Sequence, residues 1–162
     1  MALSYSFQIA TLLTVPEAGR RILEVARDLG VLVPCESVGR LLGDGAVTVR
    51  GTWVRVVPAG RFPWGRPLLG GAVFAPTVSA VFRLDKGADI AGQQDDMVRV
   101  VAGVLSAVEG DAALHLDFEE VWLARLGGGL TLSERSDVWP AARLASVPLP
   151  FGRRTHEFDF GD

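Results

Sequence analysis

The chain has 162 residues, of which 49% are apolar and 22% charged, and a formal net charge of −3. Such a chain buries about two thirds of its unfolded surface, so the composition predicts one globular domain and excludes a disordered one. Its 19 acidic and 16 basic residues are interspersed, and without a basic stripe the sequence predicts no nucleic-acid partner.

The cysteine content and the apolar stretches indicate the cell compartment in which the protein resides. Cys35 is the single cysteine, which excludes an intrachain disulfide and favours a reducing, cytoplasmic location. The apolar stretch Phe7–Val15 is interrupted by Gln8, Thr11 and Thr14 and follows no Lys or Arg, so we interpret it as a strand rather than a signal peptide. No run reaches the ~20 apolar residues that a membrane span needs.

The first half of the chain predicts a strand, a helix and a strand. Leu3–Thr11 alternates apolar and polar residues, as a strand with one buried face does. Pro16 is suited to the first turn of a helix, and Gly30 to the position just after its end. Ala46–Val57 is rich in Val, Thr and Trp and predicts one long strand, with Gly51 marking a bulge.

The second half predicts a strand, a helix, a strand and a hairpin. Acidic residues at the start of the helix favour it, because the positive end of the helix dipole attracts them. Three glycines, Gly127–Gly129, mark the turn of the hairpin. The expected elements are the strand Thr77–Asp85, the helix Gln94–Val108, the strand Ala113–Glu119 and the hairpin strands Val121–Leu126 and Leu130–Ser133.

The order of these elements predicts an α+β, two-layer sandwich in residues 1–162. Both helices would pack on one face of an antiparallel sheet, as in the ferredoxin-like β-α-β-β-α-β arrangement, with a C-terminal hairpin added. We expect residues 58–76, rich in Pro and Gly, to form an irregular loop, and residues 151–162 to form a loosely packed tail. The expected core comprises Leu3, Phe7, Ile22, Val25, Leu29, Phe82, Leu84, Met97, Val101, Leu105, Leu116 and Phe118.

The second face of the sheet would carry polar residues and face water, as is common for antiparallel sheets. His115, Asp117 and Glu119 alternate along one expected strand, each about 7 Å from the next. One metal ion would need a ligand from a neighbouring strand to join them, so we favour a solvated face over a metal site. The sequence contains no nucleophile elbow, phosphate loop or CxxC pair, and therefore predicts no enzyme and no cofactor.

Two aromatic residues, Phe62 and Trp64, lie in the expected loop. They either fold back over an open edge of the core or form an exposed recognition loop.

Several segments resemble one known family. They are "MALSYSFQIAT", "PTVSAVFRLDK", "QQDDMVRVVAGVL" and "ALHLDFEEVWLARLGGGLTLSE" followed by "WP". They are similar to the third Sit immunity type, from contact-dependent toxin exchange between bacterial kin. The resemblance is densest from Thr77 to Pro140 and implies a cytoplasmic antitoxin that binds and neutralises a delivered protein toxin.

We therefore expect an immunity-type protein that contacts its toxin through the exposed sheet face. The alternative is a small-molecule-binding protein or enzyme with a cleft under loop 58–76. The candidate partner-binding residues are His115, Asp117, Glu119, Trp122, Arg50, Arg83, Phe62 and Trp64.

Overall fold

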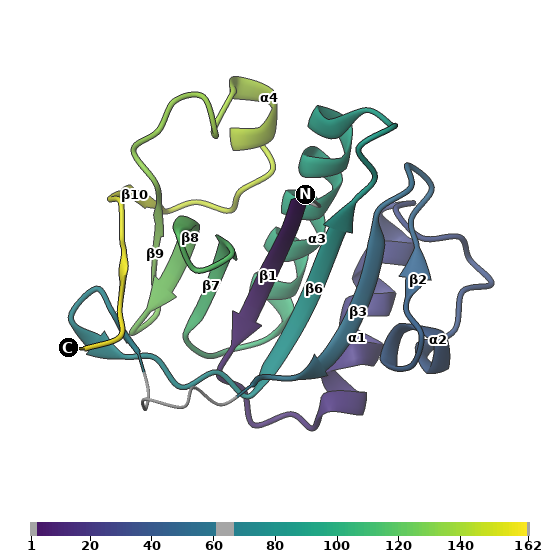
Figure 1. Cartoon of the computed structure of the whole chain (residues 1–162), viewed down its shortest axis with the longest axis horizontal. Helices are drawn as coiled ribbons and strands as arrows, with labels where there is room; N and C mark the ends of the chain where they lie inside the picture. The colour runs from purple at the N-terminus through teal and green to yellow at the C-terminus, as the bar shows by residue number, and fades with distance from the viewer. Residues whose placement is uncertain (1–2, 61–66, 162) are drawn as a thin grey trace.

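The computed structural model describes residues 3–60 and 67–161 (Figure 1). In chain order its elements are β1 (Leu3–Ile9), α1 (Val15–Asp28), α2 (Val38–Leu42), β2 (Ala46–Val47), β3 (Trp53–Pro58), β4 (Leu68–Leu69), β5 (Ala72–Val73), β6 (Val78–Leu84), α3 (Ile90–Ala107), β7 (Ala112–Leu116), β8 (Glu120–Leu126), β9 (Gly129–Leu132), α4 (Ala141–Leu144), β10 (Gly152–Arg153) and β11 (Phe158–Asp159).

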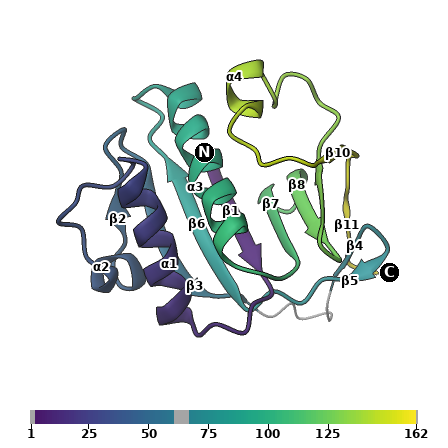
Figure 2. The same ribbon diagram turned by 180° about the vertical axis from the view of Figure 1, so that it is seen from behind.

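The main sheet has the strand order β10-β9-β8-β7-β1-β6-β3-β2. Its neighbours are antiparallel except β10 and β9, which are parallel, so the sheet is mixed. The helices α1 and α3 lie on one face of it (Figure 2). The α+β class is confirmed. The expected ferredoxin-like β-α-β-β-α-β arrangement has four strands and two helices. The observed fold instead combines an eight-stranded mixed sheet with a second sheet of three strands.

Local capping determines where the two long helices begin. Thr14 and Glu17 form a reciprocal capping box before α1. At the start of α3 the Asp89 side chain accepts a hydrogen bond from the backbone N–H of Gly92, so this helix begins at Ile90, earlier than the expected Gln94. At its far end Arg125 donates hydrogen bonds to main-chain carbonyls of Leu105, Val108 and Gly110, which satisfies acceptors that a helix end leaves free.

The principal core lies between these helices and the main sheet. Seven expected core residues are buried there: Phe7, Ile22, Phe82, Leu84, Met97, Val101 and Leu105. Four others pack against the core while partly buried: Leu3, Val25, Leu29 and Leu116. The expectation for Phe118 is wrong, because β7 ends before it and its ring contacts His115 and Phe158 instead.

The expected long strand 46–57 is wrong and is a hairpin of β2 and β3. The chain turns between them, where Gly51 has φ +101° and its backbone N–H donates to the carbonyl of Thr48. The hydroxyl of Thr52 is buried and donates to the side-chain oxygen of Gln93 in α3. A turn in the middle of an apparent strand explains why its alternation did not define one buried face.

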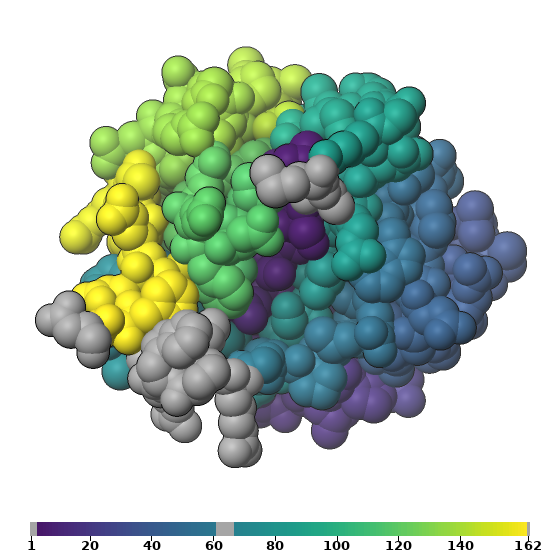
Figure 3. Space-filling view, in the orientation of Figure 1, coloured from purple at the N-terminus to yellow at the C-terminus, as the bar shows by residue number. Residues whose placement is uncertain are grey.

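The segments 58–76 and 151–162 contribute strands to a second sheet, in the order β11-β4-β5. Leu69 of this sheet and Phe74, just after β5, pack with Ala113, Val121 and Ala124 of the main sheet into a second, smaller core. This core lies on the face opposite the helices. In Figure 3 the yellow C-terminal residues lie beside the green strands. The purple β1, teal β6 and blue β3 are visible on the other side of the green strands. The expected loop therefore contains a hairpin, and the expected loose tail is paired with β9 and β4.

We expect Phe82→Ala to destabilise the protein by about 3–5 kcal/mol, because it removes a buried ring and leaves a cavity. Phe82 is 3% exposed and lies between Tyr5 and Val54 on the neighbouring strands. Urea denaturation followed by circular dichroism measures the change. Leu12→Ala is the control, because Leu12 is fully exposed and its loss is expected to change stability by less than about 0.5 kcal/mol. Equal effects of the two substitutions would contradict this assignment of the core.

Candidate functional site

An unusual backbone conformation joins β7 to β8. The expected strand 113–119 stops at Leu116, and Asp117 and Phe118 follow with φ values of 49° and 61°. Only a few per cent of residues other than glycine adopt such angles, and bulky ones such as Phe do so at a cost of about 1–3 kcal/mol. Strain of this kind persists where the surroundings impose it and occurs often at functional sites. We call Asp117, Phe118 and Glu119 the acidic turn.

The imidazole of His115 holds the acidic turn from beneath. The backbone N–H of Phe118 donates a hydrogen bond of 3.0 Å to Nδ1 of His115. Because Nδ1 is the acceptor, the ring proton is on Nε2, which lies 3.0 Å from Oε1 of Gln8 on β1. The expectation that His115 faces water is wrong, since its exposed fraction is 0%.

Aromatic rings cover His115 and keep it neutral. The ring of Phe118 lies 4.1 Å from the imidazole, and the ring of Phe158 meets it edge-on at 5.1 Å. Burial lowers the pKa of His115 from 6.5 to about 4, because a low-dielectric site disfavours the charged form. At neutral pH the acidic turn therefore has no positive charge from this histidine beneath it.

The carboxylates of the acidic turn are at the surface. Asp117 and Glu119 are exposed, whereas the next residue, Glu120, is half-buried and lies 2.7 Å from a guanidinium nitrogen of Arg135. Glu119 and Glu120 also line a cavity of about 360 Å³, whose wall includes His156 from the last part of the chain. Burial, together with the charge of Arg154, lowers the pKa of His156.

Trp122, which we expected among the partner-binding residues, is buried, with an exposed fraction of 3%. A β-bulge shifts the register between Leu114 and His115, so that Leu114 pairs with Leu123 and His115 with Val121. Trp122 lies in the principal core, edge-on to Tyr5 at 5.0 Å and under the guanidinium of Arg143. Strict alternation along β8 could not reveal this bulge.

The two candidate arginines lie in different places. Arg50 is in the turn between β2 and β3, where its Nε lies 3.1 Å from a carboxylate oxygen of Asp96 on α3. It fixes that turn to the helix and is not on the helix-free face. Arg83 is exposed on that face, with its guanidinium carbon 4.8 Å from the centroid of Trp53. Phe62 and Trp64 lie outside the described residues.

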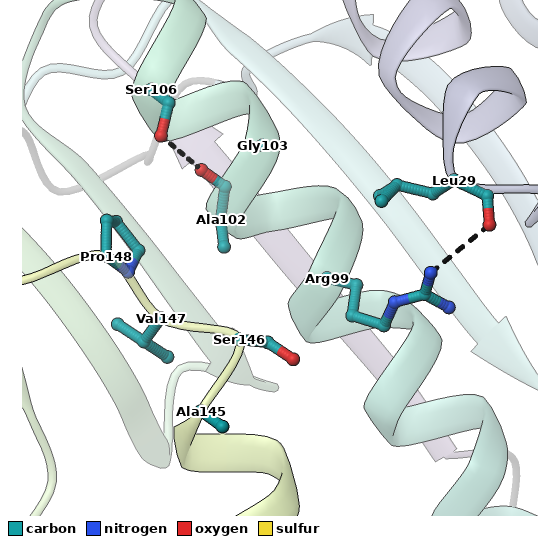
Figure 4. A pocket seen from close by; sticks show the side chains of 9 residues that line it. All are labelled: Leu29, Arg99, Ala102, Gly103, Ser106, Ala145, Ser146, Val147 and Pro148. Carbon is teal, nitrogen blue, oxygen red and sulfur yellow. Dashed lines mark hydrogen bonds between the residues drawn. The ribbon is translucent and has the colours of Figure 1, made fainter.

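Two further cavities lie away from the acidic turn. One, of about 390 Å³, separates α3 from residues 145–148 (Figure 4). Arg99 on its wall donates a hydrogen bond to the carbonyl of Leu29. The second cavity, of about 430 Å³, lies beside the exposed Leu12. Within residues 3–60 and 67–161 no cluster of three or more His, Cys, Asp or Glu side chains is arranged to hold a metal ion. No helix in that part of the chain is long and apolar enough to cross a membrane.

We expect the free energy of unfolding to decrease as pH falls from 6.5 to about 4. In that interval the unfolded chain binds a proton at residue 115 that the folded protein excludes. The stabilising contribution is complete above pH 6.5 and is lost through this window, amounting to about 3 kcal/mol. Denaturant titrations of the native protein and of His115→Gln, run across this pH range, separate this loss from that of the carboxyl groups.

Nuclear magnetic resonance provides an independent measurement of the same pKa. The chain has two histidines, so His156→Gln leaves His115 as the single imidazole to be observed. A titration midpoint for His115 near 6.5 in the folded protein would contradict its burial.

Comparison with known proteins places the chain in a family. A family model described as SitI3-like matches residues 3–143, which is most of the chain and includes β7, the acidic turn and β8. No curated protein and no solved structure matches it. The chain therefore belongs to the SitI3-like family, and this membership implies an immunity protein.

Proposed function

We propose that the protein neutralises a bacterial protein toxin by binding it directly, without catalysis, through the acidic turn and the uncovered part of the helix-free sheet face. The observation that carries the proposal is the turn itself. Two exposed carboxylates, Asp117 and Glu119, stand on a strained backbone held by a hydrogen bond to a buried neutral imidazole. Family membership supports the immunity role, and the turn supports this part of the surface as the contact.

The chemistry of the acidic turn favours a basic partner. Side chains on a preorganised backbone lose less conformational entropy on binding than side chains on a free tail. Exposed carboxylates attract a positively charged surface over long range, which accelerates association and makes it sensitive to salt. We therefore propose that the toxin presents Lys or Arg side chains to Asp117 and Glu119.

The second sheet limits the surface that is free for contact. It covers β7 and β8 with a small apolar core that includes Leu69 and Phe74. Among the described residues, the second sheet leaves free the part of the helix-free face that β1, β6 and β3 form, next to the acidic turn (Figures 1 and 3). We propose a cytoplasmic location, in agreement with the exposed, unpaired Cys35.

The alternative function is a small-molecule site under residues 58–76, of which residues 61–66 lie outside the described residues. The cavities described above are lined by other segments of the chain.

We expect Asp117→Lys with Glu119→Lys to weaken toxin binding by about 2–5 kcal/mol, because it replaces attraction by repulsion. The toxin is first identified by mass spectrometry of proteins that copurify with the tagged chain from its host, and then titrated by calorimetry. A second variant, Asp117→Asn with Glu119→Gln, removes both charges. It adds little backbone strain, because residue 117 has a positive φ, which Asn tolerates well.

The matched control is Glu24→Lys with Asp28→Lys on α1, since both residues are exposed and the charge change is the same. The control is expected to retain affinity and to protect cells that express the toxin. Unchanged affinity in a folded acidic-turn variant would move the contact elsewhere on the chain.

A further inference from the structure

A second polar surface lies on the helix-free face, across β1 from the acidic turn. On β3 and β6 every second side chain points away from the core. In this set Trp53 is paired across the strands with Arg83, and Arg55 with Val81. Arg55 and Arg83 are exposed, and Trp53 and Val81 are half-buried. We call these four residues the arginine–tryptophan patch.

The indole of Trp53 is fixed in place. Its Nε1–H donates a hydrogen bond of 3.0 Å to the carbonyl of Asp44. Gly45 lies against the same ring with φ +96°, and a Cβ on that residue would approach Nε1 of Trp53 to 2.3 Å. The guanidinium of Arg83 lies over the ring at 4.8 Å. The sequence therefore keeps a glycine where the indole needs space, and the Trp53 ring is held in place before any partner arrives.

The charge of the patch is not compensated. Exposed Arg40, Arg50 and Arg135 each form ion pairs, whereas Arg55 and Arg83 form none within residues 3–60 and 67–161. The described residues that face away from the helices on β1, β6 and β3 include no carboxylate: they are Ser4, Ser6, Gln8, Ser79, Val81, Arg83, Trp53, Arg55 and Val57. This positive surface belongs to a chain with a net charge of −3.

We propose that the arginine–tryptophan patch docks an acidic segment of a protein partner, with Arg83 and Trp53 as its anchors. A planar guanidinium binds a carboxylate through two parallel hydrogen bonds, and a guanidinium fixed on an aromatic ring is preorganised for that geometry. Tryptophan and arginine also provide most of the binding energy in many protein interfaces. A nucleic-acid ligand is disfavoured, because two arginines on an acidic chain do not form a groove that tracks a phosphate backbone.

The inference rests on the proposed function only for the identity of the partner. If that partner is the toxin, the contact has two signs: basic toxin residues face Asp117 and Glu119, and acidic ones face Arg55 and Arg83. The patch itself is tested without the toxin.

The experiment is a titration of the ¹⁵N-labelled full chain with a hexaglutamate peptide, followed by nuclear magnetic resonance at low salt. We expect saturable shifts of the Trp53 indole N–H and of the amides of Val81 and Arg83. Arg83→Ala is expected to weaken the peptide by about tenfold, equivalent to about 1.4 kcal/mol, and Arg83→Lys by a similar factor because lysine lacks the planar fork. Arg20→Ala is the control, since Arg20 is exposed on α1, which lies on the other face of the main sheet from the patch. It is expected to leave the affinity unchanged.

Three outcomes would overturn the inference: no saturable shift, shifts spread equally over Arg20 and Arg83, or tighter binding of hexathymidylate than of the peptide at the same residues. The variant Asp117→Asn with Glu119→Gln separates this inference from the proposed function. Normal peptide binding by a variant that has lost toxin binding supports the patch and the acidic turn independently. If the protein still neutralises the toxin but does not bind the peptide, the inference about the patch is contradicted and the proposed function is not.

Discussion

Burial of the His115 imidazole is the interaction on which the candidate site depends. The imidazole contacts the side chain of Gln8 on β1 and accepts a hydrogen bond from the backbone N–H of Phe118 in the turn. Desolvation costs a buried polar ring free energy unless both nitrogens have partners, and here each nitrogen has one. Because burial also keeps the ring neutral, it places no positive charge beneath the carboxylates of the acidic turn. One side chain thus holds the shape of the turn without adding charge to it.

The second sheet decides which part of the helix-free face is available. Phe158, from the end of the chain, pairs with Leu69 in β4 and packs against His115 and Phe118. Residues 144–162 lie beyond the match to the family model, yet Phe158 among them completes the cover over β7 and β8. The strands β1, β6 and β3 each pair with a strand on both sides, and a surface held in this way is suited to a protein partner.

Two surfaces of opposite charge lie next to one another on this face. The acidic turn carries Asp117 and Glu119, and the arginine–tryptophan patch carries Arg55 and Arg83, with the small Ser4 and Ser6 of β1 in the strand between the patch and β7. We propose that this arrangement orients an approaching protein, because only one direction satisfies both charges.

By itself the sequence determined the α+β class, the strands that contain Phe7 and Phe82, and the helices that carry Ile22 and Met97, since these follow from local periodicity and capping. Only the tertiary structure decided the exposure of His115 and Trp122. A period of two shows that a strand has two different faces, but not that distant segments cover the second face or that a bulge turns one residue over. Positive φ at Phe118 leaves no signal in composition either, because a hydrogen bond to His115 and the packing of rings from the end of the chain hold it in place.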